Sequence, residues 1–109
     1  MSAPSSPSQT LLLVPLAATP AQLLKVALSS SVVQVQLRQR STGLYLDLWQ
    51  DKTRLCSGVL CQDRTWLVRD KALGLPGDFT FMDTEGTQDP DYTQLGTRYR
   101  LFYRAGWNM

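Results

Sequence analysis

Alternation of apolar and polar residues runs through most of the chain from residue 21 onward. In the stretch SSSVVQVQLRQR, Val33, Val35 and Leu37 alternate with glutamine and arginine. In GLYLDLW, one face carries three leucines, Leu44, Leu46 and Leu48. Successive side chains of a β-strand point to opposite faces, so a period of two is typical of half-buried strands. This pattern predicts an all-β fold.

Polar and glycine-rich connections divide the chain into short apolar segments. Arg40–Gly43 has the length of a hairpin connection, and Gln50–Thr53 forms a second turn. Residues 21–28 could form a turn or two of helix, but the alternation of Leu24, Val26 and Leu28 favours a strand. The expected strands cover residues 21–28, 33–37, 43–49, 54–58, 65–69, 79–83 and 98–103. About seven short strands predict a small antiparallel β-barrel or β-sandwich.

The length of 109 residues fits one small domain, which we place at residues 21–105, followed by a tail at 106–109. Residues 1–20 are interpreted as a flexible N-terminal arm that orders against a partner. A secretory signal is not expected, because no basic region precedes the apolar run Leu11–Val14 and Pro15 ends it. No stretch approaches the roughly 18 apolar residues of a membrane span, so no membrane partner is expected.

The chain contains no histidine. Its absence removes the Ser-His-Asp and Cys-His nucleophile systems and the commonest neutral metal ligand. Two cysteines, Cys56 and Cys61, are too few for a four-ligand zinc site, and we expect both to be reduced and half-buried. The net charge of +2 is too weak to mark an obligatory nucleic-acid binder. We therefore expect no enzyme activity, no metal and no cofactor.

The acidic stretch at residues 83–91 has the composition of a metal-binding loop or of an acid/base site. Its carboxylates are Asp83, Glu85, Asp89 and Asp91. Counted from Asp83, the stretch has Gly86 at position 4 and Gln94 at position 12, where an EF-hand needs glycine at 6 and glutamate at 12. A catalytic carboxylate pair remains open in principle. We interpret the stretch as a long loop between strands, with solvated carboxylates and a turn at residues 89–91.

Strand alternation directs five arginines outward, and these are the candidate partner interface: Arg38, Arg40, Arg98, Arg100 and Arg104. One interpretation is a solvated sheet surface with cross-strand pairing, for example to Asp47. A second is an interface with acidic partner subunits. A third is single-stranded nucleic acid, with Tyr45, Trp49 and Trp66 as stacking residues. As exposed charges, Arg98 and Arg100 are each expected to contribute only about 0 to 1 kcal/mol to stability.

Several short motifs follow one another along the chain in a definite order and spacing. They are Pro20-Ala21-Gln22, Gln39-Arg40, TGLYLDL at 42–48, Gly58-Val59, FTFMDTEG at 79–86, Asp89-Pro90 and LGTRYRLFY at 95–103. In this arrangement the chain resembles a family of small bacteriophage proteins, the baseplate plugs of contractile tails. The family pattern differs in placing a tryptophan before the Leu-Asp-Leu strand, where this chain has Leu44 or Tyr45.

The resemblance implies a virion structural protein at the hub of the tail baseplate, near the end of the tail tube, that acts in assembly and closure. Its partners would be other baseplate, hub and tail-tube proteins and further copies of itself, and assembly would take place in the host cytoplasm. The resemblance brings no catalytic residues. The alternative function is that of a small β-barrel that binds single-stranded nucleic acid, whose affinity would fall steeply with salt.

Overall fold

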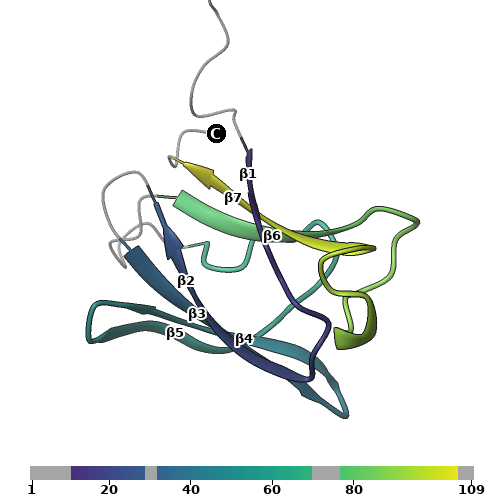
Figure 1. Ribbon diagram of the computed structural model, residues 1–109, viewed down its shortest axis with the longest axis horizontal. Helices are drawn as coiled ribbons and strands as arrows, with labels where there is room; N and C mark the ends of the chain where they lie inside the picture. The colour runs from purple at the N-terminus through teal and green to yellow at the C-terminus, as the bar shows by residue number, and fades with distance from the viewer. Residues whose placement is uncertain (1–10, 29–31, 70–76, 106–109) are drawn as a thin grey trace, which may run out of the picture.

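The computed structural model describes residues 11–28, 32–69 and 77–105, which form two antiparallel β-sheets (Figure 1). One sheet has the order β1-β7-β6, with β1 at Leu11–Val14, β7 at Tyr99–Ala105 and β6 at Gly77–Asp83. The other is β2-β3-β4-β5, with strands at Ala21–Ala27, Val32–Arg40, Gly43–Gln50 and Thr53–Leu60. A short 3-10 helix, η3, covers Tyr92–Gln94. Across these ranges we find no helix with the length and apolarity of a membrane span.

The four-stranded sheet is a meander whose turns follow the sequence pattern. Arg40 pairs with Gly43 at the end of the β3–β4 hairpin, and Gln50 pairs with Thr53 at the end of the β4–β5 hairpin. Asp51 in the second turn has a φ of 54°, a left-handed conformation that aspartate adopts more readily than most residues. The two expected hairpins are therefore confirmed, and residues 21–27 form a strand rather than helical turns.

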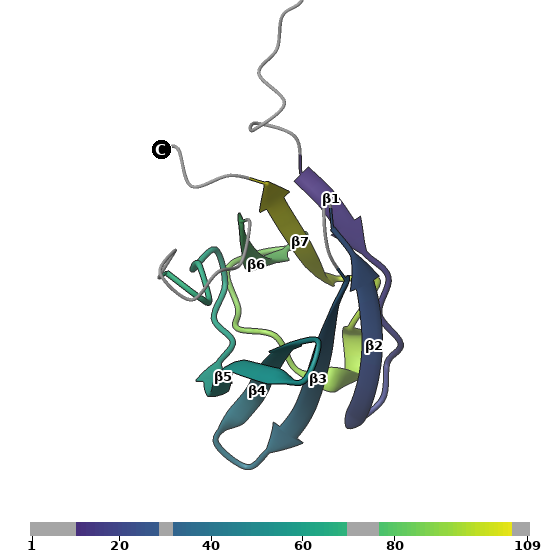
Figure 2. The ribbon, with the colours of Figure 1, turned by 90° about the vertical axis from the view of Figure 1, so that its left-hand side faces the viewer.

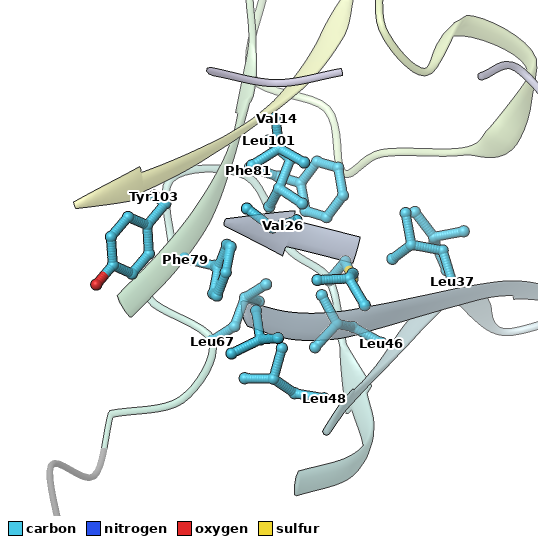
Figure 3. Packing of buried hydrophobic residues seen from close by; sticks show 14 of the residues in the cluster. Val14, Val26, Leu37, Leu46, Leu48, Leu67, Phe79, Phe81, Leu101 and Tyr103 are labelled. Atoms are coloured by element: carbon cyan, nitrogen blue, oxygen red, sulfur yellow. The ribbon is translucent and has the colours of Figure 1, made fainter. Parts of the chain in front are cut away.

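The core lies between the two sheets, which face each other in Figure 2. Alternate residues of β3 and β4 supply one side of it, and Figure 3 shows them packing against the aromatic rings of β6 and β7. Phe79 contacts Tyr103 with a distance of 5.1 Å between ring centroids. The buried hydrophobic residues of these four strands are Val33, Val35, Leu37, Leu44, Leu46, Leu48, Phe79, Phe81, Tyr99, Leu101 and Tyr103. The predicted alternation is confirmed, and the fold is an all-β sandwich.

The strand expected at residues 65–69 is not formed. Arg64 and Arg69 have φ values of 54° and 62°, and this left-handed backbone interrupts an extended strand at both ends. Between them the segment follows the edge of β6 with a single bridge from Trp66 to Thr80 and a hydrogen bond from the Leu67 N–H to the Phe79 carbonyl. The sequence pattern predicted that Trp66 and Val68 share one side of this strand. In the structure it is Leu67, between them, that is buried.

The segment expected as a flexible arm, residues 1–20, includes a strand. Leu11–Val14 forms β1, which pairs with β7 so that Leu12 lies opposite Tyr103 and Val14 opposite Leu101. Val14 is only 1% exposed and belongs to the core. The described fold thus starts at Leu11, which corrects the boundary expected at residue 21. The remainder of the expected arm, residues 1–10, and the expected tail at 106–109 lie outside the described residues.

Two leucines of the four-stranded sheet test which face is inside. Leu46 of β4 is fully buried, whereas Leu23 of β2 is 61% exposed. We expect Leu46→Ala to lower the free energy of unfolding by about 2 to 5 kcal/mol, because it removes buried methyl groups and leaves a cavity. Leu23→Ala, the matched control, should change it by about 0.5 kcal/mol or less. Urea unfolding measures both values, and equal losses would contradict the assigned faces.

Candidate assembly surface

The five candidate arginines do not come together on one surface. Arg38 and Arg40 lie on the outer face of the four-stranded sheet, whereas Arg100 and Arg104 lie on the outer face of the three-stranded sheet, between the inward residues of β7. Arg98 precedes β7 and its side chain is only 19% exposed. Four of the five arginines therefore point outward, as predicted. They lie in two pairs on opposite outer faces of the sandwich.

Arg38 forms the cross-strand pair that the alternation pattern suggested. Its guanidinium Nη2 donates to Asp47 Oδ2 at 2.9 Å. Asp47 is nevertheless only 6% exposed, because its other oxygen accepts the backbone N–H of Gly58 at 2.7 Å. Gly58 has a φ of 64° and lies where the β4–β5 register shifts. The Asp47 carboxylate thus binds an irregular stretch of β5 on one side and an arginine on the other.

Asp83 at the end of β6 is buried, contrary to the expectation of a solvated turn residue. Its carboxylate accepts hydrogen bonds from Arg98 Nε at 2.8 Å and Nη2 at 2.9 Å. It also accepts the backbone N–H groups of Glu85 and Gln88, each at 2.8 Å. The hydrogen bonds from Arg98 lower the pKa of Asp83 well below its usual range, against the opposing effect of burial. The expectation that Arg98 is a solvated or partner-facing charge is therefore wrong.

The other carboxylates of the acidic stretch bind the backbone at separate places. Asp89 Oδ1 accepts the N–H of Asp63 at 3.0 Å, and Asp91 caps η3 by accepting the N–H of Thr93 at 2.9 Å. Glu85 is exposed. Within the described ranges, no group of three or more potential metal-ligating side chains is found. The long loop between strands β6 and β7 is confirmed, and its carboxylates organise the loop itself.

A groove of about 300 Å³ lies beside the outer face of the three-stranded sheet. The Arg104 guanidinium carbon lies 4.2 Å from the centroid of the Trp66 ring, a cation–π contact. Arg64 is anchored there by an ion pair with Asp63 and by a hydrogen bond to the Gly86 carbonyl at 3.1 Å. The groove, called the Trp66 groove below, is lined by Leu11, Arg64, Trp66, Thr80, Met82 and Arg104.

Sequence reasoning found only part of the Trp66 groove. Alternation on β7 placed Arg104 on the outer face, but the groove also needs Leu11 from β1 and Trp66 from the segment beside β6. These residues are far apart in the chain, and no local pattern relates them. The three aromatic residues considered for nucleic-acid stacking are also separated, since Trp49 and Tyr45 lie on β4 in the other sheet. They do not form one stacking surface.

The two thiols are free, as expected. Cys56 on β5 is half-buried, and Cys61, directly after that strand, is buried. Burial, with a smaller contribution from the negative charge of Asp47, raises the pKa of Cys56 to about 11. Burial raises the pKa of Cys61 further. Both cysteines therefore act as packing residues at neutral pH.

By its geometry the chain is a small β-sandwich with an apolar, arginine-bearing groove on one sheet. Residues 11–106 match the protein family described as cyanophage baseplate Pam3 plug gp18, so the chain belongs to this family. The match includes β1 as well as the later strands. A search of curated proteins gave no match. The protein is thus a structural component of a phage tail baseplate, which interacts with other baseplate or tail proteins in the virion.

The pairing of Asp83 with Arg98 predicts a pH-dependent contribution to stability. Because the folded-state pKa of Asp83 is lowered, its contribution is fully present above the unfolded value of about 3.9 and is lost as the pH falls toward the folded value. Asp83→Asn should lower the urea midpoint at pH 7, and its difference from the wild type should shrink steadily below about pH 4. Asp51→Asn, in an exposed turn, serves as the control. A difference that does not vary with pH would contradict this assignment.

The raised thiol pKa values predict slow reaction in the folded protein. At pH 8 only about a thousandth of a thiol with a pKa near 11 is ionised, so Cys56 should react with a disulfide reagent at least about a hundredfold more slowly than free cysteine. Unfolding in guanidinium should release two thiols. The measurement is the time course of thiol titration with and without denaturant. A native thiol that titrates within seconds would show that the β5 region opens readily.

Proposed function

We propose that this protein is a non-catalytic subunit at the hub of a contractile-tail baseplate, near the end of the tail tube, where it acts in assembly and closure. The observation that carries the proposal is the family match over residues 11–106. Copies of the chain associate with one another and with neighbouring hub and tube proteins after synthesis in the host cytoplasm. The separated aromatic residues give no support to the single-stranded nucleic-acid alternative, whose steep salt dependence would distinguish it.

The Trp66 groove and the arginines beside it form the surface that best fits such contacts. On β6 the carboxylates of Asp78 and Asp83 are buried and bind backbone N–H groups, whereas Glu85 in the following loop is exposed. Arg100 is exposed, and the Arg104 guanidinium lies over the Trp66 ring. β7 therefore presents the positive charge of Arg100 next to the apolar groove. Aromatic residues and arginine are enriched at protein interfaces, and a partner with an apolar side chain beside acidic residues would be complementary.

Charge reversal tests this surface. In the double variant Arg100→Glu, Arg104→Glu, repulsion from an acidic partner should slow the encounter and weaken binding, so phages that depend on it should give few plaques and incomplete baseplates. Loss of the Arg104–Trp66 contact should cost about 1 kcal/mol of stability, and the new carboxylate would also lie opposite the buried Asp78, so the melting temperature is part of the test. Arg40→Glu, on the opposite sheet, is the matched control and should complement normally. The assay is complementation of a phage that lacks the gene, together with thermal melting of each variant.

Two outcomes would count against the proposal. Normal plaque numbers from a stably folded double variant would show that the arginine-bearing face is only solvated. An equal loss with Arg40→Glu would show that general charge, rather than this surface, controls assembly. A double variant that melts near the wild-type temperature is required before either result is interpreted.

A further inference from the structure

The edge strands of the two sheets differ in how they are protected. The outer edge of β6 is covered by residues 63–67, because the N–H groups of Arg64 and Leu67 donate to the carbonyls of Phe81 and Phe79. On β5, register shifts and the left-handed Gly58 interrupt the edge. Charged side chains, bulges and covering segments are the usual protection of sheet edges against pairing with another chain.

Within the described residues, the edge strand β1 carries no charged side chain, bulge or covering segment; it is four residues long and is followed by Pro15. Among the described residues it pairs with β7 alone, and Figure 2 shows it at the rim of its sheet. Its sequence is Leu-Leu-Leu-Val, without charge, glycine or proline. Leu11, Leu12 and Leu13 are 43%, 45% and 47% exposed. Both faces of the strand are therefore apolar at an open edge, whereas β2, the other uninterrupted edge, carries the exposed Lys25.

We propose that two copies of the protein pair through β1, in antiparallel orientation, with Leu12 of one copy opposite Leu12 of the other. This inference rests on the self-association included in the proposed function and names the surface that carries it. The joined sheet would have the strand order β6-β7-β1-β1-β7-β6. Its new ladder would satisfy the backbone N–H and C=O groups that β1 directs away from β7.

A second copy fits this edge because β1 complements itself. In antiparallel pairing centred on Leu12, Leu11 of one copy lies opposite Leu13 of the other. Both leucines are on the outer face of their three-stranded sheet, so the joined sheet keeps one continuous outer face. The contacts are leucine against leucine, and no charge is buried. A twofold interface of this kind uses the same patch on both subunits.

Repulsion between the arginine-bearing faces does not oppose this pairing. Arg100 and Arg104 lie on β7, one strand behind β1 in each copy. With strands about 4.8 Å apart, the two β7 strands lie about 14 Å from each other. This distance exceeds the screening length of about 8 Å at physiological salt. The pairing therefore keeps the positive faces apart while it covers the leucines.

The test uses Leu12, because Leu11 also lines the Trp66 groove. Directly opposite residues of antiparallel strands have Cβ atoms about 4.5 to 5.5 Å apart, so Leu12→Cys should form a disulfide-linked dimer on mild oxidation. Leu23→Cys, on the rim strand β2 and also well exposed, is the control and should stay monomeric. Wild-type protein, in which Cys61 is buried and Cys56 is half-buried, should also remain unlinked. Equal cross-linking of the two variants, or none in Leu12→Cys, would overturn the pairing.

Sedimentation equilibrium gives a second measurement without a new thiol. The wild type should show a reversible monomer–dimer equilibrium, and Leu12→Lys should weaken it by about tenfold or more while the circular dichroism melt stays unchanged. A wild type that is monomeric at all accessible concentrations overturns the inference and leaves the proposed baseplate role standing. A dimeric wild type whose Arg100→Glu, Arg104→Glu variant complements the phage normally supports the pairing and tells against the docking surface alone.

Discussion

The Asp83 carboxylate is the interaction on which the three-stranded sheet depends. It lies at the end of β6 and binds Arg98, 15 positions later and immediately before β7. The same carboxylate accepts two N–H groups of the connecting loop, and the backbone N–H of Asp83 donates to Asp63 at 2.7 Å. A buried charge is costly unless it is paired and hydrogen-bonded, and here both conditions are met. The Asp83 side chain thus connects the ends of β6 and β7 and the loop between them, and its backbone N–H connects β6 to the segment beside it.

Two further buried aspartates use the same principle in other parts of the sandwich. Asp47 accepts the N–H of Gly58 where β5 is irregular, and Asp78 accepts the N–H groups of Val68 and Arg69, each at 2.8 Å. Backbone N–H groups in irregular segments lack ladder partners, and leaving them buried without an acceptor would cost about 1 to 3 kcal/mol each. The aspartates therefore allow a small domain to keep irregular connections closely packed against its sheets.

This internal ordering leaves particular surfaces for assembly. The carboxylates of Asp78 and Asp83 are buried, and the outer face of the three-stranded sheet presents Arg100 and the Trp66 groove with Arg104. The β1 edge adds exposed leucines without any charge. The chain belongs to a family of baseplate plugs, and a structural baseplate protein works through surfaces of this kind.

The sequence by itself determined the all-β class, the two hairpins and the inward faces of residues 33–37, 44–48 and 99–103, because a period of two is a local property of the chain. It also indicated free thiols and outward arginines on β7. Only the tertiary structure decided that Leu11–Val14 is a strand. These four apolar residues form a strand because they pair with β7 and because Val14 is buried in the core. Likewise Asp83 is buried because Arg98 reaches it, and Arg104 meets Trp66, through contacts that distant segments make only after folding.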